Sequence, residues 1–285
     1  AYASRQSINQ NQIRDISSKI DSTGNIEWDV PEGKWLLLRL GMTPTGAVNK
    51  PVPPVATGLE CDKFSEEAVD THFNAYLGKF LNRMDESQRQ SLKTVVIDSY
   101  EVGPQNWTNN FREIFKAQYG YDPLPWLPVL TGRIVGNSEQ SNRFLWDLRR
   151  LSADLIANEY VDGLQQLCNE NGLKLWLENY GHWGFPAEFL QYGGQADQIA
   201  GEFWFRNGLW NLGPLECRAV SSAAHIYGKK SVFAEAFTAG FSFKQYPAIM
   251  KPRGDAMFCE GINHFVHHLY IHQPWTERKP GVNAW

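Results

Sequence analysis

Four short apolar runs in this 285-residue sequence each end in an acidic side chain. The runs are Val95–Glu101, Leu173–Glu178, Ile199–Glu202 and Ser231–Glu235. Each run is rich in large or β-branched apolar residues, which is typical of a buried strand. A buried strand that ends in a carboxylate places charge at the rim of the core, so the pattern indicates that these strand ends form the floor of a reaction pocket.

Helical patterns separate these runs. Ser65 is a candidate N-cap, and apolar residues follow it at helical spacing. Further helices are predicted near 111–118, over 144–168 and just before Ser231, whereas the Pro-rich segment 121–132 is predicted to be a loop. Strands that alternate with helices favour βα units and a parallel sheet.

Two parallel folds fit this alternation. A doubly wound sheet would carry an early Gly-rich phosphate loop, and the sequence shows none. A (β/α)₈ TIM-type barrel places its active site at the carboxyl ends of several strands, which fits the four acidic ends. The candidate strands are 36–40, 58–61, 94–99, 173–178, 199–203, 231–236 and 262–270.

Seven candidate strands are one short of a closed barrel. We therefore expect a barrel catalytic domain over 34–285 that is truncated at its C-terminus, unless one irregular strand escapes the pattern. Residues 1–33 are polar and end in a strand-like alternation, so we expect the tail of an accessory β-rich module or a linker there.

The composition favours a carbohydrate partner. Aromatic residues make up 13% of the chain, and the C–H face of a pyranose packs well on an aromatic ring, although large cores also use such residues. The formal net charge is −4 without blocks of like charge, which argues against a nucleic-acid or membrane-surface partner. No apolar stretch approaches the roughly 18 residues of a membrane span.

Glycoside hydrolysis needs two carboxyl groups that flank one glycosidic oxygen. Glu101 and Glu235 are candidates because each follows a strand and has aromatic neighbours, although any single acid can instead cap a helix or form a salt bridge. Asp98 lies three positions before Glu101, so both can face one pocket. Clustered carboxylates repel one another, and a hard cation with oxygen ligands such as calcium would neutralise them.

A zinc site is the alternative that the histidines raise. His264, His268 and His272 share one face of a strand, and three histidines can bind zinc. There is no HExxH motif, however, and four-residue spacing on a strand holds the rings too far apart for one ion. We expect these histidines to line the pocket and bind sugar hydroxyls, or to be partly structural.

The longer motifs resemble glycoside hydrolase family 106, the α-L-rhamnosidases. The similarity covers residues 34–285 and is carried by DSYEVGPQNWT, YDPLPWLPVLTGRIVG, SNRFLWDLRRLSADLIANEY, GEFW, SSAAHIYGKKSVFAEAFT and GINHFVHHLYIHQPW. The resemblance implies a large bacterial enzyme, periplasmic or secreted, with a (β/α)₈ catalytic barrel and β-sandwich accessory domains. It also implies an inverting, calcium-assisted mechanism.

The resemblance further implies roles for individual residues. Glu101 in DSYE would be the general acid and Glu235 in AEAFT the general base, with carboxyls roughly 6.5–9.5 Å apart to admit a water. Asp98 and Glu202 would hold calcium. The substrate-binding candidates are Glu178, His182, Trp204 and His268, of which Glu178 is a metal or a sugar contact. His267 stands where an aromatic is expected and is a poor site candidate.

The sequence therefore predicts an exo-acting glycosidase that releases terminal α-L-rhamnose from polysaccharides or glycosides. Two alternatives remain open. One is a barrel glycosidase of other sugar specificity, with a retaining mechanism as one option. The other is a carbohydrate-binding relic without turnover, which the acids at positions 101 and 235 disfavour.

Overall fold

The computed structural model describes residues 7–50, 52–179, 181, 185–205, 214–239, 245–269 and 276–277. The chain falls into two compact units. The first comprises residues 1–46 and 105–153, and the second comprises residues 47–104 and 154–285. All four acid-terminated strands lie in the second unit. The domain boundary at residue 33 stays a prediction.

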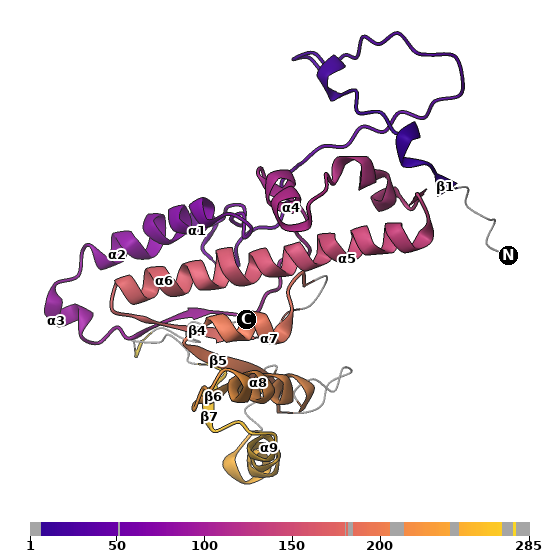
Figure 1. Ribbon diagram of the computed structural model, residues 1–285. Helices are drawn as coiled ribbons and strands as arrows, with labels where there is room; N and C mark the ends of the chain where they lie inside the picture. Colours follow the sequence, from indigo (N-terminus) through magenta and orange to yellow (C-terminus); the bar gives the residue numbers. More distant parts are fainter. Residues whose placement is uncertain are drawn as a thin grey trace. The chain divides into compact units, whose positions relative to one another are not determined.

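A parallel five-stranded sheet forms the centre of the second unit (Figure 1). Its strands are β2 (Thr94–Ile97), β4 (Lys174–Glu178), β5 (Gln198–Trp204), β6 (Val232–Thr238) and β7 (His264–His267). The spatial order β2-β4-β5-β6-β7 follows the sequence, as successive βα units require. The predicted mixed α/β fold is confirmed as a curled half-barrel, whereas a complete eight-stranded barrel is not confirmed.

Two predicted strands are absent. Residues 36–40 form no regular strand, and residues 58–61 contribute only a single bridge from Leu59 to Val48. The side chains of Leu36 and Leu37 are 65% and 55% exposed, so the apolar run lies against no neighbouring layer. A strand needs a second chain segment to pair its backbone groups, and apolar composition does not supply one.

The helices predicted after Ser65, over 144–168 and before Ser231 are present, whereas the sequence analysis did not predict the helices Glu86–Arg89, Phe189–Gln195 and Pro247–Cys259. Ser65 is the N-cap of α1, because its hydroxyl accepts the backbone N–H of Ala68. Gly172 adopts a left-handed φ of 72° between the long helix and β4. The helical segments are α1 (Glu66–Phe73), η4 (Asn74–Gly78), α2 (Lys79–Leu81), α3 (Glu86–Arg89), η6 (Ile156–Asp162), α6 (Gly163–Glu170), α7 (Phe189–Gln195), α8 (Pro214–Ile226) and α9 (Pro247–Cys259), and the 3₁₀ turn η3 (Pro54–Ala56) precedes them.

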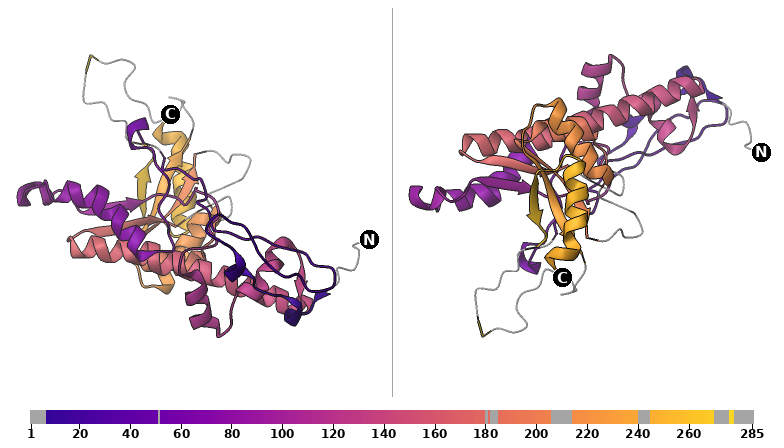
Figure 2. Two further views of the ribbon diagram at one scale, coloured as in Figure 1. Left: turned by 90° about the horizontal axis from the view of Figure 1, so that it is seen from above. Right: turned by 90° about the horizontal axis from the view of Figure 1, so that it is seen from below.

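One face of the sheet packs against α8 and α9 (Figures 1 and 2). Ile199 and Phe203 of β5 are fully buried in this core together with Val220 of α8 and Met257 of α9. Gly201 lies between them, and a Cβ there would come within 3.2 Å of Val220 Cγ2. Since side chains alternate along a strand, the even-numbered residues of β5, including Glu202, face the other way.

The first unit contains a two-stranded parallel pair of β1 (Ser7–Ile8) and β3 (Ile134–Val135). Its helical segments are η1 (Gln10–Gln12), η2 (Ser17–Lys19), α4 (Phe111–Tyr119), η5 (Leu124–Thr131) and α5 (Ser138–Leu155), and α5 ends just inside the second unit. The predicted Pro-rich loop is wrong in part, because η5 is a 3₁₀ helix. Pro125 stands in the first turn of η5, where no backbone donor is needed, whereas Pro128 lies inside the helix.

Among the described residues, no helix combines the length and the apolar character that crossing a membrane requires.

Candidate active site

The three neighbouring strands β4, β5 and β6 present acidic side chains on one face of the sheet, toward the carboxyl ends of the strands. Glu202 of β5 pairs in register with Glu235 of β6, so their side chains lie side by side. Glu178 ends β4 and pairs with Ala200, which shares a face with Glu202 because the two are two residues apart. Asp98 follows β2 directly. The structure therefore assembles the acids at the carboxyl edge of the sheet, where the sequence predicted a pocket.

The tightest group is Asp98, Glu178 and Glu235. One carboxylate oxygen from each lies within 4.8 Å of the other two. Glu178 is 1% exposed, Glu235 is half-buried and Asp98 is exposed. Three carboxylates on separate segments supply hard oxygen donors, which suit calcium and differ from the nitrogen- and sulfur-rich sets of zinc sites. This donor set fits the calcium ion that the sequence predicts.

Burial raises the pKa of two carboxyls of this group, Glu178 and Glu235. Burial raises the pKa of Glu178 to about 11, helped by a hydrogen bond with Asp98 and by its charge. Burial also raises the pKa of Glu235. Two neighbours act in the opposite direction and lower this pKa: the Thr238 hydroxyl, which donates to Glu235 Oε1 at 2.5 Å, and the charge of His268. Three ionised carboxylates at this spacing need a compensating positive charge, and a bound cation reverses these pKa shifts.

Glu202 is a neighbour of Glu235 but is not one of the three clustered acids. Its side chain is 5% exposed, and burial raises its pKa to about 8, with further contributions from the charges of Glu235, Glu216 and Glu101. The structure thus joins Asp98 to Glu178 and Glu235, whereas the sequence analysis paired it with Glu202. Of the two roles considered for Glu178, the geometry favours the metal contact.

Ser99 links Glu101 to this group. Its hydroxyl donates to Glu101 Oε1 at 2.6 Å, and its backbone N–H donates to Glu178 Oε2 at 3.0 Å. Glu101 is exposed, and its charge contributes to raising the pKa of Glu235, so the two predicted catalytic acids lie near each other. The sequence analysis missed Ser99 and Thr238, although both stand within three residues of a predicted acid.

The remaining candidates are placed unevenly. Trp204 ends β5 with its indole nitrogen buried, and the backbone N–H of His268 donates to Ala236 O at 3.1 Å, which puts His268 beside β6 near Glu235. The ring of His267 stacks on Phe237, with centroids 5.5 Å apart. The described residues form one group of three metal-binding side chains, and it contains no histidine. His182 and His272 lie outside the described residues.

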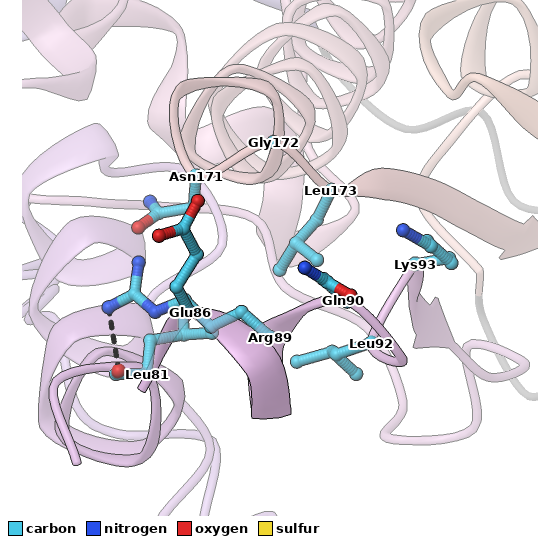
Figure 3. A pocket seen from close by; sticks show the side chains of 9 residues that line it. All are labelled: Leu81, Glu86, Arg89, Gln90, Leu92, Lys93, Asn171, Gly172 and Leu173. Carbon is cyan, nitrogen blue, oxygen red and sulfur yellow. Dashed lines mark hydrogen bonds between the residues drawn. The ribbon is translucent and has the colours of Figure 1, made fainter. Parts of the chain in front are cut away.

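A separate pocket lies at the opposite end of the strands (Figure 3). It includes Lys93 and Leu173, which directly precede β2 and β4, so it faces the amino edge of the sheet. Arg89 donates to Leu81 O there at 2.6 Å. The pocket is therefore distinct from the acidic site.

Comparisons with known proteins bear on the family and the fold of this chain. The family model described as alpha-L-rhamnosidase matches residues 1–284. A Formosa agariphila protein named "Putative beta-glucuronidase" is 39% identical over 275 residues, which are 96% of this chain and 23% of that protein. The structure titled "Structure of Rhamnosidase from Novosphingobium sp. PP1Y" matches with a TM-score of 0.79 and 31% identity, over 96% of this chain and 27% of that one.

The chain thus spans about a quarter of the length of these two relatives. Within that quarter the match to the family model is nearly end to end, and the similar solved structure shares its fold. This chain belongs to glycoside hydrolase family 106, the alpha-L-rhamnosidases.

Proposed function

We propose that the protein containing this chain is an inverting, exo-acting α-L-rhamnosidase that releases terminal rhamnose from polysaccharides or glycosides. The observation that carries the proposal is the assembly of Glu101, Glu235 and their acidic neighbours at one edge of a parallel sheet. Family membership supplies the reaction class, and the edge supplies the two carboxyl groups that the reaction needs.

Glu101 acts as the general acid. Its exposed position at the rim leaves it in reach of a leaving group that extends away from the sheet. The Ser99 hydroxyl donates to Glu101 Oε1 and thereby helps to orient the carboxyl group that protonates the glycosidic oxygen. A general acid works best when a fixed hydrogen bond orients it toward the atom that it protonates.

Glu235 acts as the general base on the opposite side of the sugar. Thr238 donates to its Oε1, which leaves Oε2 to accept a proton from the attacking water. A base must be ionised before the reaction, and the Thr238 hydroxyl and His268 both favour the ionised form. We expect Glu101 and Glu235 to lie roughly 6.5–9.5 Å apart across the bound sugar, as inversion requires.

Calcium fits as the resident ion. Asp98 and Glu178 would hold it, with Glu235 beside them and Glu202 as a further neighbour. When bound, calcium would supply positive charge that keeps these carboxyls ionised and would offer positions for sugar hydroxyls. Glu202, Trp204 and His268 stand close enough to this edge to contact the remaining hydroxyls, and we assign them to substrate binding.

The charge of the site favours a neutral sugar. Rhamnose carries no ionisable group, whereas a glucuronide brings a carboxylate. Five acids converge at this edge, and His268 is the one basic side chain that acts on Glu235 there within the described residues. The calcium ion proposed above would offset part of this negative charge, so the family match carries the choice of substrate. We therefore favour rhamnosides over the activity in the name of the Formosa agariphila relative.

We also propose that the complete protein closes this sheet into an eight-stranded barrel. Val96 and Val266 lie on the same face as the acids by register and are 60% and 44% exposed, as expected for barrel-lining residues without their opposite strands. Rhamnose-containing glycans are extracellular polymers, so a periplasmic or secreted location suits this activity.

Aryl glycosides test the proposal directly. The full-length protein should hydrolyse an aryl α-L-rhamnoside and leave the matching aryl β-D-glucuronide intact, and proton NMR should show β-rhamnose as the first product. Glu101→Gln and Glu235→Gln should each abolish hydrolysis of unactivated rhamnosides. If the protein cleaves only the glucuronide, the proposed substrate is wrong. If α-rhamnose is the first product, the mechanism is retaining and the proposed inversion is wrong.

A further inference from the structure

Strand β6 carries an extra residue at Phe237. Phe203 of β5 pairs with Ala236 of β6. The next residue of β5, Trp204, pairs with Thr238, so the pairing passes over Phe237. An extra residue of this kind in one strand of a pair forms a β-bulge, which redirects side chains and is common beside active sites. The bulge lies two residues after the proposed general base.

The bulge reverses the alternation of faces along β6. Ala234 and Ala236 are buried in the core against α8 and α9, whereas Glu235 faces the other acids. Regular alternation would place Phe237 beside Glu235, but Phe237 lies in the same core as Ala236. Thr238 consequently faces the acids, and its hydroxyl donates to Glu235 Oε1 at 2.5 Å. Residues three positions apart on a regular strand face opposite ways, so this hydrogen bond depends on the bulge.

We propose that the bulge at Phe237 makes Thr238 a positioning residue for Glu235. The proposal rests on the proposed function of Glu235 as general base. A glutamate side chain has three rotatable bonds and samples several rotamers unless a contact selects one. The Thr238 hydroxyl supplies such a contact before substrate binds. A carboxylate that is already oriented can take a proton from the attacking water without first losing rotamer freedom.

The packing around Phe237 holds the bulge in place. Phe237 has a left-handed φ of 63°, which bulky side chains rarely adopt, and no other non-glycine residue of the described part has a positive φ. Its ring is 6% exposed, lies 4.9 Å from the ring of Phe203 and stacks on His267. Gly254 of α9 leaves room for it, because a Cβ there would come within 3.2 Å of Phe237 Cζ. Burial of the ring therefore maintains a backbone conformation that would otherwise be strained.

Thr238 is held between the strands on both sides of β6. Its side chain belongs to a residue that is 3% exposed, and its carbonyl oxygen accepts the backbone N–H of Phe205 at 3.0 Å. On the β7 side, the backbone N–H of His268 donates to Ala236 O at 3.1 Å. Threonine is branched at Cβ and has few χ1 rotamers. The hydroxyl donor is therefore fixed before Glu235 accepts from it.

Kinetics of the full-length enzyme test the positioning role. Thr238→Val removes the hydroxyl and keeps a similar shape, so kcat should fall about tenfold, equivalent to about 1.4 kcal/mol, while KM changes less than about twofold. The loss should be equal for poor and activated leaving groups, because both reactions need the attacking water. Thr238→Ser should bring kcat back to within about threefold of the wild type. Thr71→Val, at an exposed position of α1, is the matched control and should change neither constant.

Three results would overturn the proposal. An unchanged kcat in Thr238→Val would show that the neighbouring acids or a bound cation suffice to orient Glu235. A loss of kcat that serine does not restore would show that Thr238 acts through packing. A raised KM with an unchanged kcat would show that Thr238 contributes to substrate binding and not to the orientation of the base.

A readout without substrate keeps this proposal separate from the proposed function. In atomic-resolution crystal structures of the full-length protein, Glu235 should occupy one rotamer in the wild type and in Thr71→Val, and several in Thr238→Val. Phe237 should have a positive φ in all three. If the wild type cleaves no rhamnoside, the proposed function fails, yet these structures still decide whether Thr238 orients Glu235. A single unchanged Glu235 rotamer in Thr238→Val would refute that role.

Discussion

Glu216 should make the protein less stable as the pH rises, and Glu216→Gln should remove this effect. Glu216 lies in the first turn of α8, and its Oε2 is buried without a hydrogen-bond partner in the described part of the chain. Burial raises its pKa from 4.5 to about 7. The folded state therefore retains a proton between these values that the unfolded state has lost, so stability is full below pH 4.5 and declines up to about pH 7.

The size of the effect follows from that pKa. Each pKa unit corresponds to about 1.4 kcal/mol, so the shift of Glu216 from 4.5 to about 7 sets an upper bound of about 3 kcal/mol. The side chain is only partly buried, and water reduces the penalty to about 1–2 kcal/mol. Glutamine has nearly the same shape and no charge, so Glu216→Gln should be more stable than the wild type by this amount at pH 8 and equal to it at pH 4.

Urea denaturation at pH 4, 6 and 8 measures the difference in unfolding free energy. The matched control is Glu170→Gln, which removes an exposed carboxylate at the end of α6 and should change stability by less than about 0.5 kcal/mol at every pH. A Glu216→Gln advantage that is the same at pH 4 and pH 8 would refute the argument, because a packing effect does not titrate. A destabilised variant at pH 8 would show that the Glu216 carboxylate has a partner.

Three further predictions concern the sheet and the site. Gly201→Ala should destabilise the protein by about 1–3 kcal/mol, because the new Cβ would lie 3.2 Å from Val220 Cγ2 and 3.3 Å from Glu216 O, and thermal unfolding measures the loss. Glu101→Gln should lower kcat more for poor leaving groups than for activated aryl rhamnosides, and equal losses would remove it from the acid role. Chelation should lower the Tm, with about 2.7 kcal/mol regained at a calcium concentration 100 times its Kd, and Glu178→Gln should abolish this response.

The sequence predicts those parts of the fold that short-range patterns determine. The strands before Asp98, Glu178 and Glu235 follow from apolar runs, and Ser65 and Gly172 mark helix ends by their own side-chain and backbone chemistry. Residues 36–40 carry an equally strong apolar run and form no strand. Pairing depends on segments distant in sequence, and no local pattern reports whether such a segment is present.

The sequence predicted which acids belong to the site, but it did not predict how they are arranged in space. The sequence places Asp98, Glu178, Glu202 and Glu235 at strand ends. The structure has Asp98 directly after β2 and Glu178 at the end of β4, whereas β5 and β6 continue past Glu202 and Glu235. Which three come together depends on register and sheet curvature, and neither is visible in the sequence. Ser99 escaped notice for a related reason, because a serine beside an acid is common and only the three-dimensional distances reveal its two carboxylate partners.

Curvature of the sheet is what makes the metal-binding proposal physically reasonable. Glu178 belongs to β4 and Glu235 to β6, and β5 lies between them. Neighbouring strands are about 4.8 Å apart, so β4 and β6 of a flat sheet would be separated by roughly 9–10 Å, with parallel side chains at the same separation. Their carboxylate oxygens nevertheless lie within 4.8 Å of each other. The sheet curls into a half-barrel, and side chains on the concave face of such a curl converge, so the same curvature brings together the acids that we propose to hold the cation.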